Sequence, residues 1–249
     1  MTEPVLKPGE RAEDLQYKGL RIIQNEGGFR FGTDSVLLAG FVSAGKNSRG
    51  IDLGTGTGVI AILVEGRTGA KLTAVEIQPE QCDMARRSFM MNEQDITLIE
   101  GDMRTVYEIT GRGVFDAAVC NPPYYPTGAG RLSQKGGEGY EGAATHELYC
   151  DLNTVAKTAE ILLKFGGKLF MCCPAARLAE AICALKNSGL EPKRIRTVAS
   201  VEGKPPYLVL IEAKKGASPG LKWEKELAVC KKDGSYTDEA NSIYHRAGL

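Results

Sequence analysis

Between residues 49 and 188 the chain alternates short apolar runs with longer segments of helical character. Strands are predicted near 49–53, 71–76, 96–100, 114–120 and 167–173, and helices near 58–66, 79–92, 152–164 and 175–188. Alternation of this kind is typical of a doubly wound α/β sheet whose strands run mostly parallel.

The C-terminal part departs from this alternation. Two strand-like segments, 193–201 and 207–213, have no long helix between them, so we expect them to pair antiparallel as a hairpin. The complete pattern predicts a seven-stranded, Rossmann-like sheet that is mostly parallel and ends in an antiparallel hairpin.

The residues before the first of these strands predict an appendage. Residues 1–16 are polar and rich in Glu, Pro and Gly, which indicates a loose arm. A strand at 20–24 is expected to pair with residues 29–31 across a glycine turn. A helix should follow, with Thr33 or Asp34 as its N-cap.

The size of the chain fits one compact unit. Its 249 residues, 43% of them hydrophobic, can form one large core, or one core with a small appendage. We expect an N-terminal arm, hairpin and helix at 1–45 and the main domain at 46–249. Residues 1–150 carry a net charge of −5 and residues 151–249 one of +5. A basic C-terminal part favours a phosphate-bearing partner, and ordinary scatter explains so small a difference equally well.

Cysteine usage and the N-terminus indicate the compartment. The seven cysteines show no metal-ligand spacing, so no metal is expected, and most should be small core residues in a reducing environment. The N-terminus lacks an apolar signal core, and no apolar run approaches the ~20 residues that span a bilayer. These features predict a cytoplasmic protein with no membrane partner. They leave the oligomeric state open, with a monomer as the simplest expectation.

A glycine turn follows the first strand of the alternating region. Residues 51–60 read Ile-Asp-Leu-Gly-Thr-Gly-Thr-Gly-Val-Ile, and this G-x-G-x-G spacing differs from the dinucleotide fingerprint. Its glycines permit close approach of the backbone to a ligand. The candidate binding residues in this turn are Asp52, Gly54, Gly56 and Gly58.

Acidic residues follow the next two predicted strands. Glu76 ends the second strand, where a carboxylate can bind both hydroxyls of a ribose, unless it is simply a solvated strand end. Asp102 follows the third strand and is either a second ligand contact or a cap of its own turn.

The sequence Asn121-Pro122-Pro123-Tyr124 follows the fourth strand of this region. Two consecutive prolines remove two backbone donors and keep both carbonyls, and the asparagine adds a side-chain carbonyl. This wall of acceptors suits a planar substrate that presents an NH2 group. The alternative is a rigid turn that only ends a strand.

The glycine turn, the two acids and the Asn-Pro-Pro-Tyr sequence, in this order, resemble the motif series of class I S-adenosylmethionine-dependent methyltransferases. The resemblance implies that Asp52 orients the turn or binds the methionine amino group, that Glu76 binds the ribose, and that Asp102 and Met103 contact the adenine. Asn121 lies where cofactor and substrate meet.

For catalysis, the Asn121 side-chain oxygen and the Pro122 carbonyl are expected to accept the two hydrogens of an exocyclic amine. This contact would direct the nitrogen lone pair toward the methyl group without a strong general base. Tyr124 and Tyr125 are expected to stack on the base, and Pro123 lies between the acceptors and these rings.

The whole chain resembles the bacterial tRNA1(Val) (adenine-N6)-methyltransferase family. The most specific motif is Phe-Arg-Phe-Gly-Thr-Asp-Ser-Val-Leu-Leu-Ala at 29–39, supported by Ala-Thr-His-Glu at 144–147 and by the segment 206–211. The resemblance implies methylation of N6 of the adenine next to the anticodon. It also implies that Phe31, Thr33 and Asp34 close over the cofactor.

Contacts with tRNA phosphates are expected from basic residues on or near the tail hairpin, namely Lys193, Arg194, Arg196, Lys204, Lys214 and Lys215. A solvated strand edge protected by charge is the alternative for each of them. Three other functions remain open: methylation of a protein glutamine of the release-factor type, methylation of guanine N2 in ribosomal RNA, and cofactor binding by a non-enzymatic regulator.

Overall fold

The computed structural model describes residues 5–27, 32–122 and 151–244. Its main sheet contains nine strands in these residues, in the order β10-β8-β9-β7-β6-β3-β4-β5, with β11 also paired to β8. The strands are β3 (Arg49–Leu53), β4 (Lys71–Glu76), β5 (Thr97–Glu100), β6 (Phe115–Cys120), β7 (Leu163–Pro174), β8 (Leu190–Val201), β9 (Pro206–Lys215), β10 (Lys222–Trp223) and β11 (Leu227–Cys230). The α/β class is confirmed, and the predicted number of seven strands is too low by two.

Most neighbouring strands run parallel, and the tail hairpin is antiparallel as predicted. Strands β5, β4, β3, β6 and β7 pair in parallel along the sheet. Strand β9 pairs antiparallel with both β7 and β8, so it reverses the direction of the sheet between them. The two strands that the sequence did not predict are β10, which has two residues, and β11, which has four.

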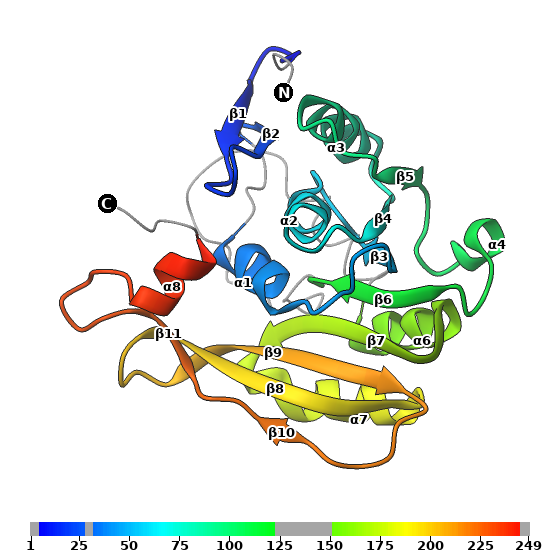
Figure 1. The fold of residues 1–249 in the computed structure, drawn as a ribbon, viewed down its shortest axis with the longest axis vertical. Helices are drawn as coiled ribbons and strands as arrows, with labels where there is room; N and C mark the ends of the chain where they lie inside the picture. Colours follow the sequence, from blue (N-terminus) through cyan, green and yellow to red (C-terminus); the bar gives the residue numbers. More distant parts are fainter. Residues whose placement is uncertain (1–4, 28–31, 123–150, 245–249) are drawn as a thin grey trace.

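Helices cover both faces of this sheet (Figure 1). They are α1 (Thr33–Phe41), α2 (Val59–Thr68), α3 (Pro79–Met91), α4 (Tyr107–Thr110), α6 (Leu152–Leu162), a short 3-10 turn η1 (Ala175–Arg177), α7 (Leu178–Asn187) and α8 (Asp238–Ile243). Helices α1, α2 and α3 pack on one face, and α6 and α7 pack on the other.

Alternation of side chains assigns each strand residue to one of these faces. In β7, Phe170 and Cys172 belong to the core beneath α1, whereas Met171 and Cys173 belong to the core beneath α6 and α7. All four are almost completely buried. Long, continuously apolar strands are expected where helices cover both faces of a parallel sheet.

The N-terminal segment is more ordered than the sequence predicts. Residues 10–14, expected within a loose arm, form β1 (Glu10–Asp14), which pairs antiparallel with β2 (Arg21–Asn25). The described partner of β2 is therefore β1. Residues 29–31, which were predicted to pair with this strand, lie outside the described part of the chain.

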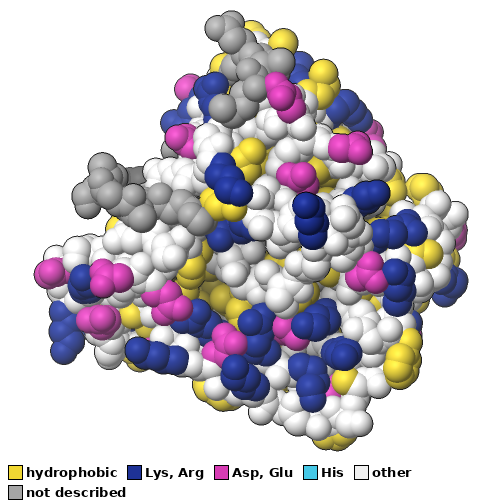
Figure 2. Space-filling view, viewed as in Figure 1, with side chains coloured by type: hydrophobic (Ala, Val, Ile, Leu, Met, Phe, Trp, Pro, Cys, Tyr) yellow, Lys and Arg dark blue, Asp and Glu magenta, His cyan; other side chains and the backbone are white. Residues whose placement is uncertain are grey.

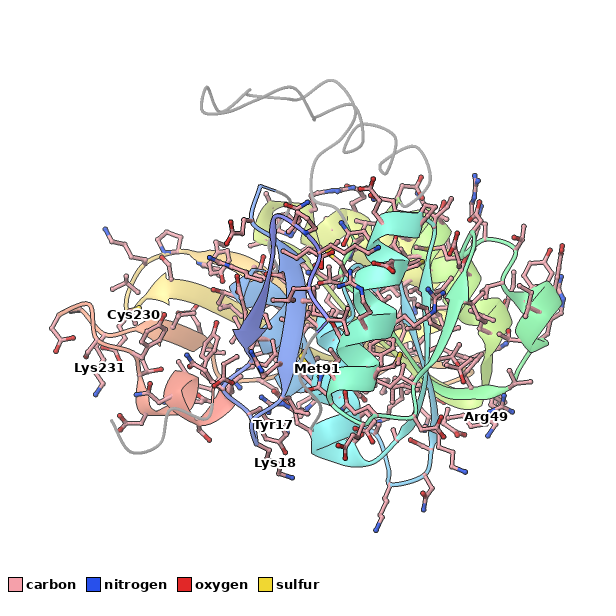
Figure 3. The ribbon with its side chains drawn as sticks, turned by 90° about the horizontal axis from the view of Figure 1, so that it is seen from above. Tyr17, Lys18, Arg49, Met91, Cys230 and Lys231 are labelled. Atoms are coloured by element: carbon pink, nitrogen blue, oxygen red, sulfur yellow. The ribbon has the colours of Figure 1, made fainter. Side chains whose placement is uncertain are left out.

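This hairpin is attached to α3, beside which it lies in Figure 3. Ile23 packs with Met84 and Met91. The Arg87 guanidinium donates to both carboxylate oxygens of Glu10 at 2.6 Å, and it holds the pKa of that carboxyl below its usual value. Charge pairing to α3 thus gives the polar strand β1 a fixed place that its own sequence pattern does not indicate.

Helix α1 begins at Thr33, and the residue before it, Gly32, is the N-cap. Neither Thr33 nor Asp34 is the N-cap, so that prediction is wrong. Both residues lie inside the first turn of the helix, where Asp34 is favourable because the helix dipole is positive at this end.

Candidate active site

The candidate site lies at the edge of the sheet where its parallel strands end. Strand β3 lies between β4 and β6. After β3 the chain continues outward through β4 and β5, and it then returns to place β6 on the other side of β3, so the order of the strands reverses at β3. In open α/β sheets, ligands bind in the crevice at such a reversal of strand order. The glycine turn follows β3, Glu76 ends β4, and Asn121 follows β6, so the sheet brings these sequence-predicted residues to one edge.

The glycine turn has a left-handed backbone at each of its glycines. The φ angles are +72° at Gly54, +59° at Gly56 and +97° at Gly58. A Cβ on Gly58 would come within 2.5 Å of the Phe89 ring, so packing of α3 requires glycine there. A Cβ on Gly56 would meet no atom within 4 Å among the described residues, so the turn faces open space at that point.

Glu76 fixes the shape of this turn. Its buried carboxylate accepts a hydrogen bond from the Gly56 amide and two more from the amides of Ile77 and Gln78, each at 2.9 Å. An ionised carboxylate has about four acceptor positions, so these three bonds leave capacity for a ligand hydroxyl.

Asp52 lies fully buried beneath the same turn. Its Oδ2 accepts from the Thr55 hydroxyl at 2.6 Å, whereas Oδ1 has no hydrogen-bond partner within the described residues. Burial raises the pKa of Asp52 to about 7, and the Thr55 hydroxyl and the Ala61 amide only partly oppose this rise. The side chain therefore orients the turn and keeps one acceptor atom unused.

Asp102 caps the turn that follows β5. Its carboxylate accepts from the backbone amide of Arg104 at 2.8 Å and pairs with the Arg104 guanidinium, whose hydrogen bonds lower the pKa of the carboxyl. The neighbouring Met103 lies half-buried, and its methyl group lies 3.4 Å from the position of a Cβ on Gly54. Asp102 and Met103 thus flank the glycine turn on its β5 side.

Asn121 has its carboxamide held on two sides. Its Nδ2 donates to the Ser35 hydroxyl of α1 at 3.0 Å, and its Oδ1 accepts from the Cys172 thiol of β7 at 3.0 Å. Pro122 follows as a buried residue. Sequence reasoning did not predict the roles of Ser35 and Cys172, because no pattern connects them with Asn121.

Helix α1 also contacts the tail hairpin at this edge. The Tyr207 hydroxyl, at the start of β9, donates to Asp34 Oδ1 at 3.1 Å. Thr33 is exposed beside it. Thr33, Asp34 and Tyr207 therefore line the same end of the sheet as Asn121.

Four residues of the predicted site, Phe31, Pro123, Tyr124 and Tyr125, lie outside the described residues. The structure therefore places the asparagine and the first proline of the Asn-Pro-Pro-Tyr sequence, together with the glycine turn and both acids.

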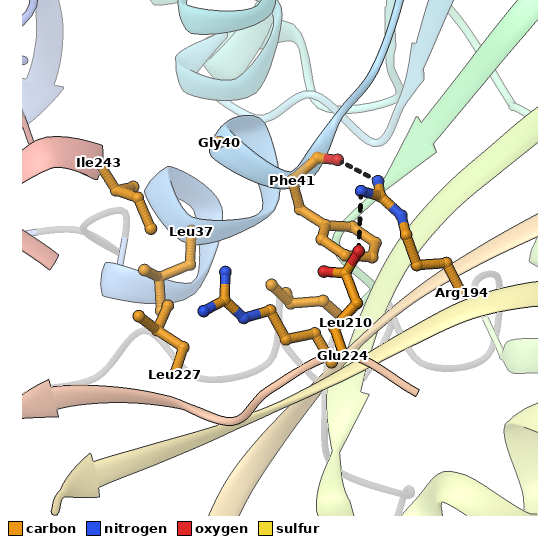
Figure 4. A pocket seen from close by; sticks show the side chains of 9 residues that line it. Leu37, Gly40, Phe41, Arg194, Leu210, Glu224, Leu227 and Ile243 are labelled. Atoms are coloured by element: carbon orange, nitrogen blue, oxygen red, sulfur yellow. Dashed lines mark hydrogen bonds and ion pairs between the residues drawn. The ribbon is translucent and has the colours of Figure 1, made fainter. Parts of the chain in front are cut away.

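The two arginines predicted to contact phosphate have partners within the protein, and Figure 4 shows Arg194 joined to the Phe41 carbonyl and to Glu224. Arg194 donates to the Phe41 carbonyl at 2.7 Å, stacks 3.9 Å from the centroid of the Phe41 ring and pairs with Glu212 and Glu224. Arg196 binds the Lys225 carbonyl and pairs with Glu239 at 2.6 Å.

These contacts attach the C-terminal strands and α8 to α1 around a small pocket. Its lining includes Leu37, Leu210, Leu227 and Ile243. Lys204 differs from the two arginines, since it is exposed in the turn between β8 and β9. Strand β8 runs in the same direction as β7, so this turn lies at the same edge as the site.

Further basic side chains belong to the C-terminal strands. Figure 2 shows many Lys and Arg side chains over the part of the molecule formed by β7 to β10. Lys164, the second residue of β7, pairs with Asp116 at the edge opposite Asn121, and Lys168, near the middle of this strand, pairs with Glu212. These two basic side chains therefore have acidic partners within the protein.

Two further features are absent from the described ranges. No cluster of three or more His, Cys, Asp or Glu side chains arranged to bind a metal ion is found there. Within the same ranges, no helix has the length and apolar character needed to cross a membrane.

Comparison with known proteins agrees with this geometry. Residues 26–134 match the family model of the methyltransferase small domain. A tRNA1(Val) (adenine(37)-N6)-methyltransferase of Shewanella amazonensis is 29% identical over 87% of this chain and 90% of its own. The protein of the same name from Phocaeicola vulgatus is 27% identical over 80% and 83%. These matches confirm the resemblance that the sequence motifs predicted.

Solved structures share the fold. A predicted O-methyltransferase from Agrobacterium tumefaciens superposes with a TM-score of 0.68 at 22% identity, over 85% of this chain and 95% of that one. A geranyl diphosphate C-methyltransferase from Streptomyces coelicolor, solved with S-adenosyl-L-homocysteine, superposes with a TM-score of 0.50 at 16% identity, over 72% and 80%.

The fold and the arrangement at the end of β3, β4 and β6 therefore define a methyltransferase of the doubly wound α/β class. Within that class, residues 26–134 are similar to the methyltransferase small domain.

Proposed function

We propose that this protein transfers the methyl group of S-adenosylmethionine to N6 of an adenine in tRNA, namely the adenine next to the anticodon of tRNA1(Val). The observation that carries the proposal is the position of Asn121 and Pro122, which follow β6 directly across the strand reversal from the glycine turn. The names of the relatives that align with most of the chain support the choice of RNA.

The residues around the glycine turn fit S-adenosylmethionine. Open space at Gly56 admits a ligand against the backbone, and Glu76 keeps acceptor capacity beside it for ribose hydroxyls. The unused Oδ1 of Asp52 and the half-buried Met103 lie on either side of the turn. In the proposal, Thr33, Asp34 and Phe31 cover the cofactor, and Asp102 contacts its adenine. The cofactor supplies an activated methyl group.

The protein then has to align the acceptor. Its Asn121 side-chain oxygen and its Pro122 carbonyl accept the two N6 hydrogens, which directs the nitrogen lone pair toward the methyl group. Alignment of two reactants contributes roughly 7–11 kcal/mol to lowering a barrier, so no strong general base is required. Pro123, Tyr124 and Tyr125 complete the proposed pocket and stack on the base.

Contact with the RNA backbone is proposed for Lys204, which is exposed at the edge of the site. Arg194 and Arg196 are proposed to act on the RNA only indirectly, by fixing the tail against α1, because their guanidinium groups have partners within the protein. An anticodon-loop adenine is unpaired, so it needs only modest unstacking to enter the pocket. The proposal includes a cytoplasmic location, where tRNA is available as a substrate.

The test is methyl transfer from labelled S-adenosylmethionine to a tRNA1(Val) transcript, followed by nucleoside mass spectrometry. The expected product is N6-methyladenine, and a transcript with guanine in place of that adenine should remain unlabelled. Release factor and a ribosomal RNA fraction are assayed in parallel, and label appearing there instead would overturn the proposal in favour of glutamine or guanine methylation.

A variant tests the acceptor wall itself. Asn121→Ala should abolish transfer while S-adenosylmethionine binding, measured by calorimetry, stays within a few fold of the wild type. Asn187→Ala, which alters an exposed asparagine at the end of α7, is the control and should retain full activity. Transfer retained by Asn121→Ala would exclude the proposed geometry.

A further inference from the structure

The register of the sheet places Cys172 beside Asn121. Cys120, the last residue of β6, is the partner of Met171 in β7, so the next residue of each strand lies on the opposite face. That face is the one covered by α1, which contributes Ser35. Three segments that are far apart in the sequence therefore meet around one carboxamide.

The contacts at this carboxamide distinguish its oxygen from its nitrogen. The Cys172 thiol donates to Oδ1, and Nδ2 donates to the Ser35 hydroxyl, both at 3.0 Å. Rotation of the amide by half a turn would direct the Nδ2 hydrogens at the thiol, which is a poor acceptor. The thiol therefore favours the observed orientation, whereas the Ser35 hydroxyl, which can both donate and accept, holds the other end of the amide in place.

Burial strengthens this preference. Ser35 is 5% exposed and Cys172 is 0% exposed. Water therefore has little access to replace either hydrogen bond, and an unmatched polar atom here is costly. The weak thiol donor uses one of the two lone pairs of Oδ1.

We propose that Ser35 and Cys172 are positioning residues that fix the Asn121 carboxamide with Oδ1 as the acceptor for the substrate amine. The inference rests on the proposed function, in which this oxygen accepts an N6 hydrogen. Without these contacts the amide rotates, and the donor Nδ2 opposes the amine for part of the time.

The chain offers matched controls for both residues. Cys173 is the neighbour of Cys172 in β7 and is equally buried, yet it lies in the core beneath α6 and α7. Ser88 is a fully buried helical serine whose hydroxyl bonds to Ile23 and Met84, away from Asn121. Cys173→Ala and Ser88→Ala therefore remove similar groups without touching the carboxamide.

The kinetic test compares kcat and KM for methyl transfer to the tRNA1(Val) transcript. We expect Ser35→Ala and Cys172→Ala each to lower kcat roughly five- to tenfold, with KM for the RNA little changed. Cys172→Ser retains a donor and should recover most of the loss. Both controls should retain kcat even where their melting temperatures fall. A loss of kcat equal in Cys172→Ala and Cys173→Ala would overturn the proposal.

A second readout does not depend on the substrate. The side-chain NH2 resonances of Asn121, assigned by their loss in Asn121→Asp, should shift or broaden in Ser35→Ala and Cys172→Ala and stay in place in both controls. If the wild type methylates no adenine, the proposed function fails, and these resonances still decide whether the two residues hold the amide. Unchanged resonances in both variants would overturn the positioning role.

Discussion

The Tyr207 hydroxyl donates a hydrogen bond of 3.1 Å to Asp34, which joins the first residues of β9 to the first turn of α1 across 173 positions of the sequence. Burial, followed by the charge of Asp34, raises the pKa of Tyr207 above its usual value. The hydroxyl therefore remains protonated and able to donate across the physiological range. This bond ties the proposed cover of the cofactor to the sheet.

Tyr207→Phe removes this bond and keeps the ring. We expect a stability loss of about 1 kcal/mol and an affinity for S-adenosylmethionine that is weaker by roughly three- to tenfold, because Asp34 loses its orientation. Calorimetric titration and urea unfolding measure the two effects. Tyr17→Phe is the control, since Tyr17 donates to the Gly66 carbonyl and is distant from the site. Equal cofactor affinities in the two variants would contradict the role given to Asp34.

Alanine substitutions at two glycines of the turn should lower stability to different extents. Gly58→Ala brings a Cβ to within 2.5 Å of the Phe89 ring at a φ of +97°, so overpacking and backbone strain should cost about 2–4 kcal/mol of stability. Gly56→Ala meets no atom within 4 Å in the described residues and should lose only about 1–2 kcal/mol. Urea unfolding of both variants measures this difference.

Cofactor binding should separate the same two variants. In Gly56→Ala the new methyl group occupies the open space proposed for the cofactor, so the folded variant should bind S-adenosylmethionine at least tenfold more weakly. A Gly56→Ala protein that binds the cofactor as well as the wild type would place the ligand elsewhere.

The strands of the main sheet were predictable because their burial is visible in the sequence. Predicted strands at 49–53 and 71–76 have the bounds of β3 and β4, since continuous apolar runs are typical of strands covered on both faces. Strand β1 was missed because Glu10–Asp14 has no apolar alternation, and β10 was missed because two residues are too few to form a pattern.

In the candidate site, too, some residues were predictable from local sequence patterns and others were not. Glu76 was predictable from its place at the end of a strand, and the structure adds that it also holds the turn through the Gly56 amide. Ser35 and Cys172 were not, because they reach Asn121 over 86 and 51 residues of sequence. Contacts of that range follow from strand register and helix packing, which local patterns do not encode. Arg194 and Arg196 were predicted to contact phosphate because they are basic. The sequence did not reveal that both form ion pairs within the protein.

Glu76→Gln tests both roles of the Glu76 carboxylate, which holds the glycine turn and is proposed to bind the ribose of the cofactor. An amide nitrogen in place of one oxygen would face a backbone N–H, so at least one of the three hydrogen bonds is lost and two donors oppose each other. We expect about 1–3 kcal/mol of lost stability and S-adenosylmethionine binding below detection by calorimetry. Glu100→Gln, at the paired end of β5, alters an exposed carboxylate and should change neither property. Wild-type cofactor affinity in Glu76→Gln would remove this residue from the site.

The raised pKa of Asp52 should make the stability of the protein depend on pH in an unusual way. Its pKa is raised from 3.8 to about 7 in the folded protein, so the folded state holds a proton that the unfolded state releases. The contribution of this group to stability is fully present below its ordinary pKa and is lost as the pH rises toward about 7. The asparagine of Asp52→Asn cannot ionise, so this variant lacks the pH-dependent contribution to stability. The free energy of unfolding of the wild type, relative to the variant, should therefore fall by up to about 1.4 kcal/mol per pH unit across this window.

Urea unfolding of both proteins at intervals between pH 4.5 and pH 8 measures this difference. Asp102→Asn is the control of opposite sign, because the Arg104 guanidinium lowers the pKa of Asp102, and its contribution is lost only under more acidic conditions. The difference in free energy of unfolding between the wild type and Asp102→Asn should therefore stay constant between pH 4.5 and pH 8. If the difference between the wild type and Asp52→Asn is equally constant, the buried carboxyl is ionised throughout this range. In that case the Thr55 hydroxyl and the Ala61 amide offset the cost of burying its charge.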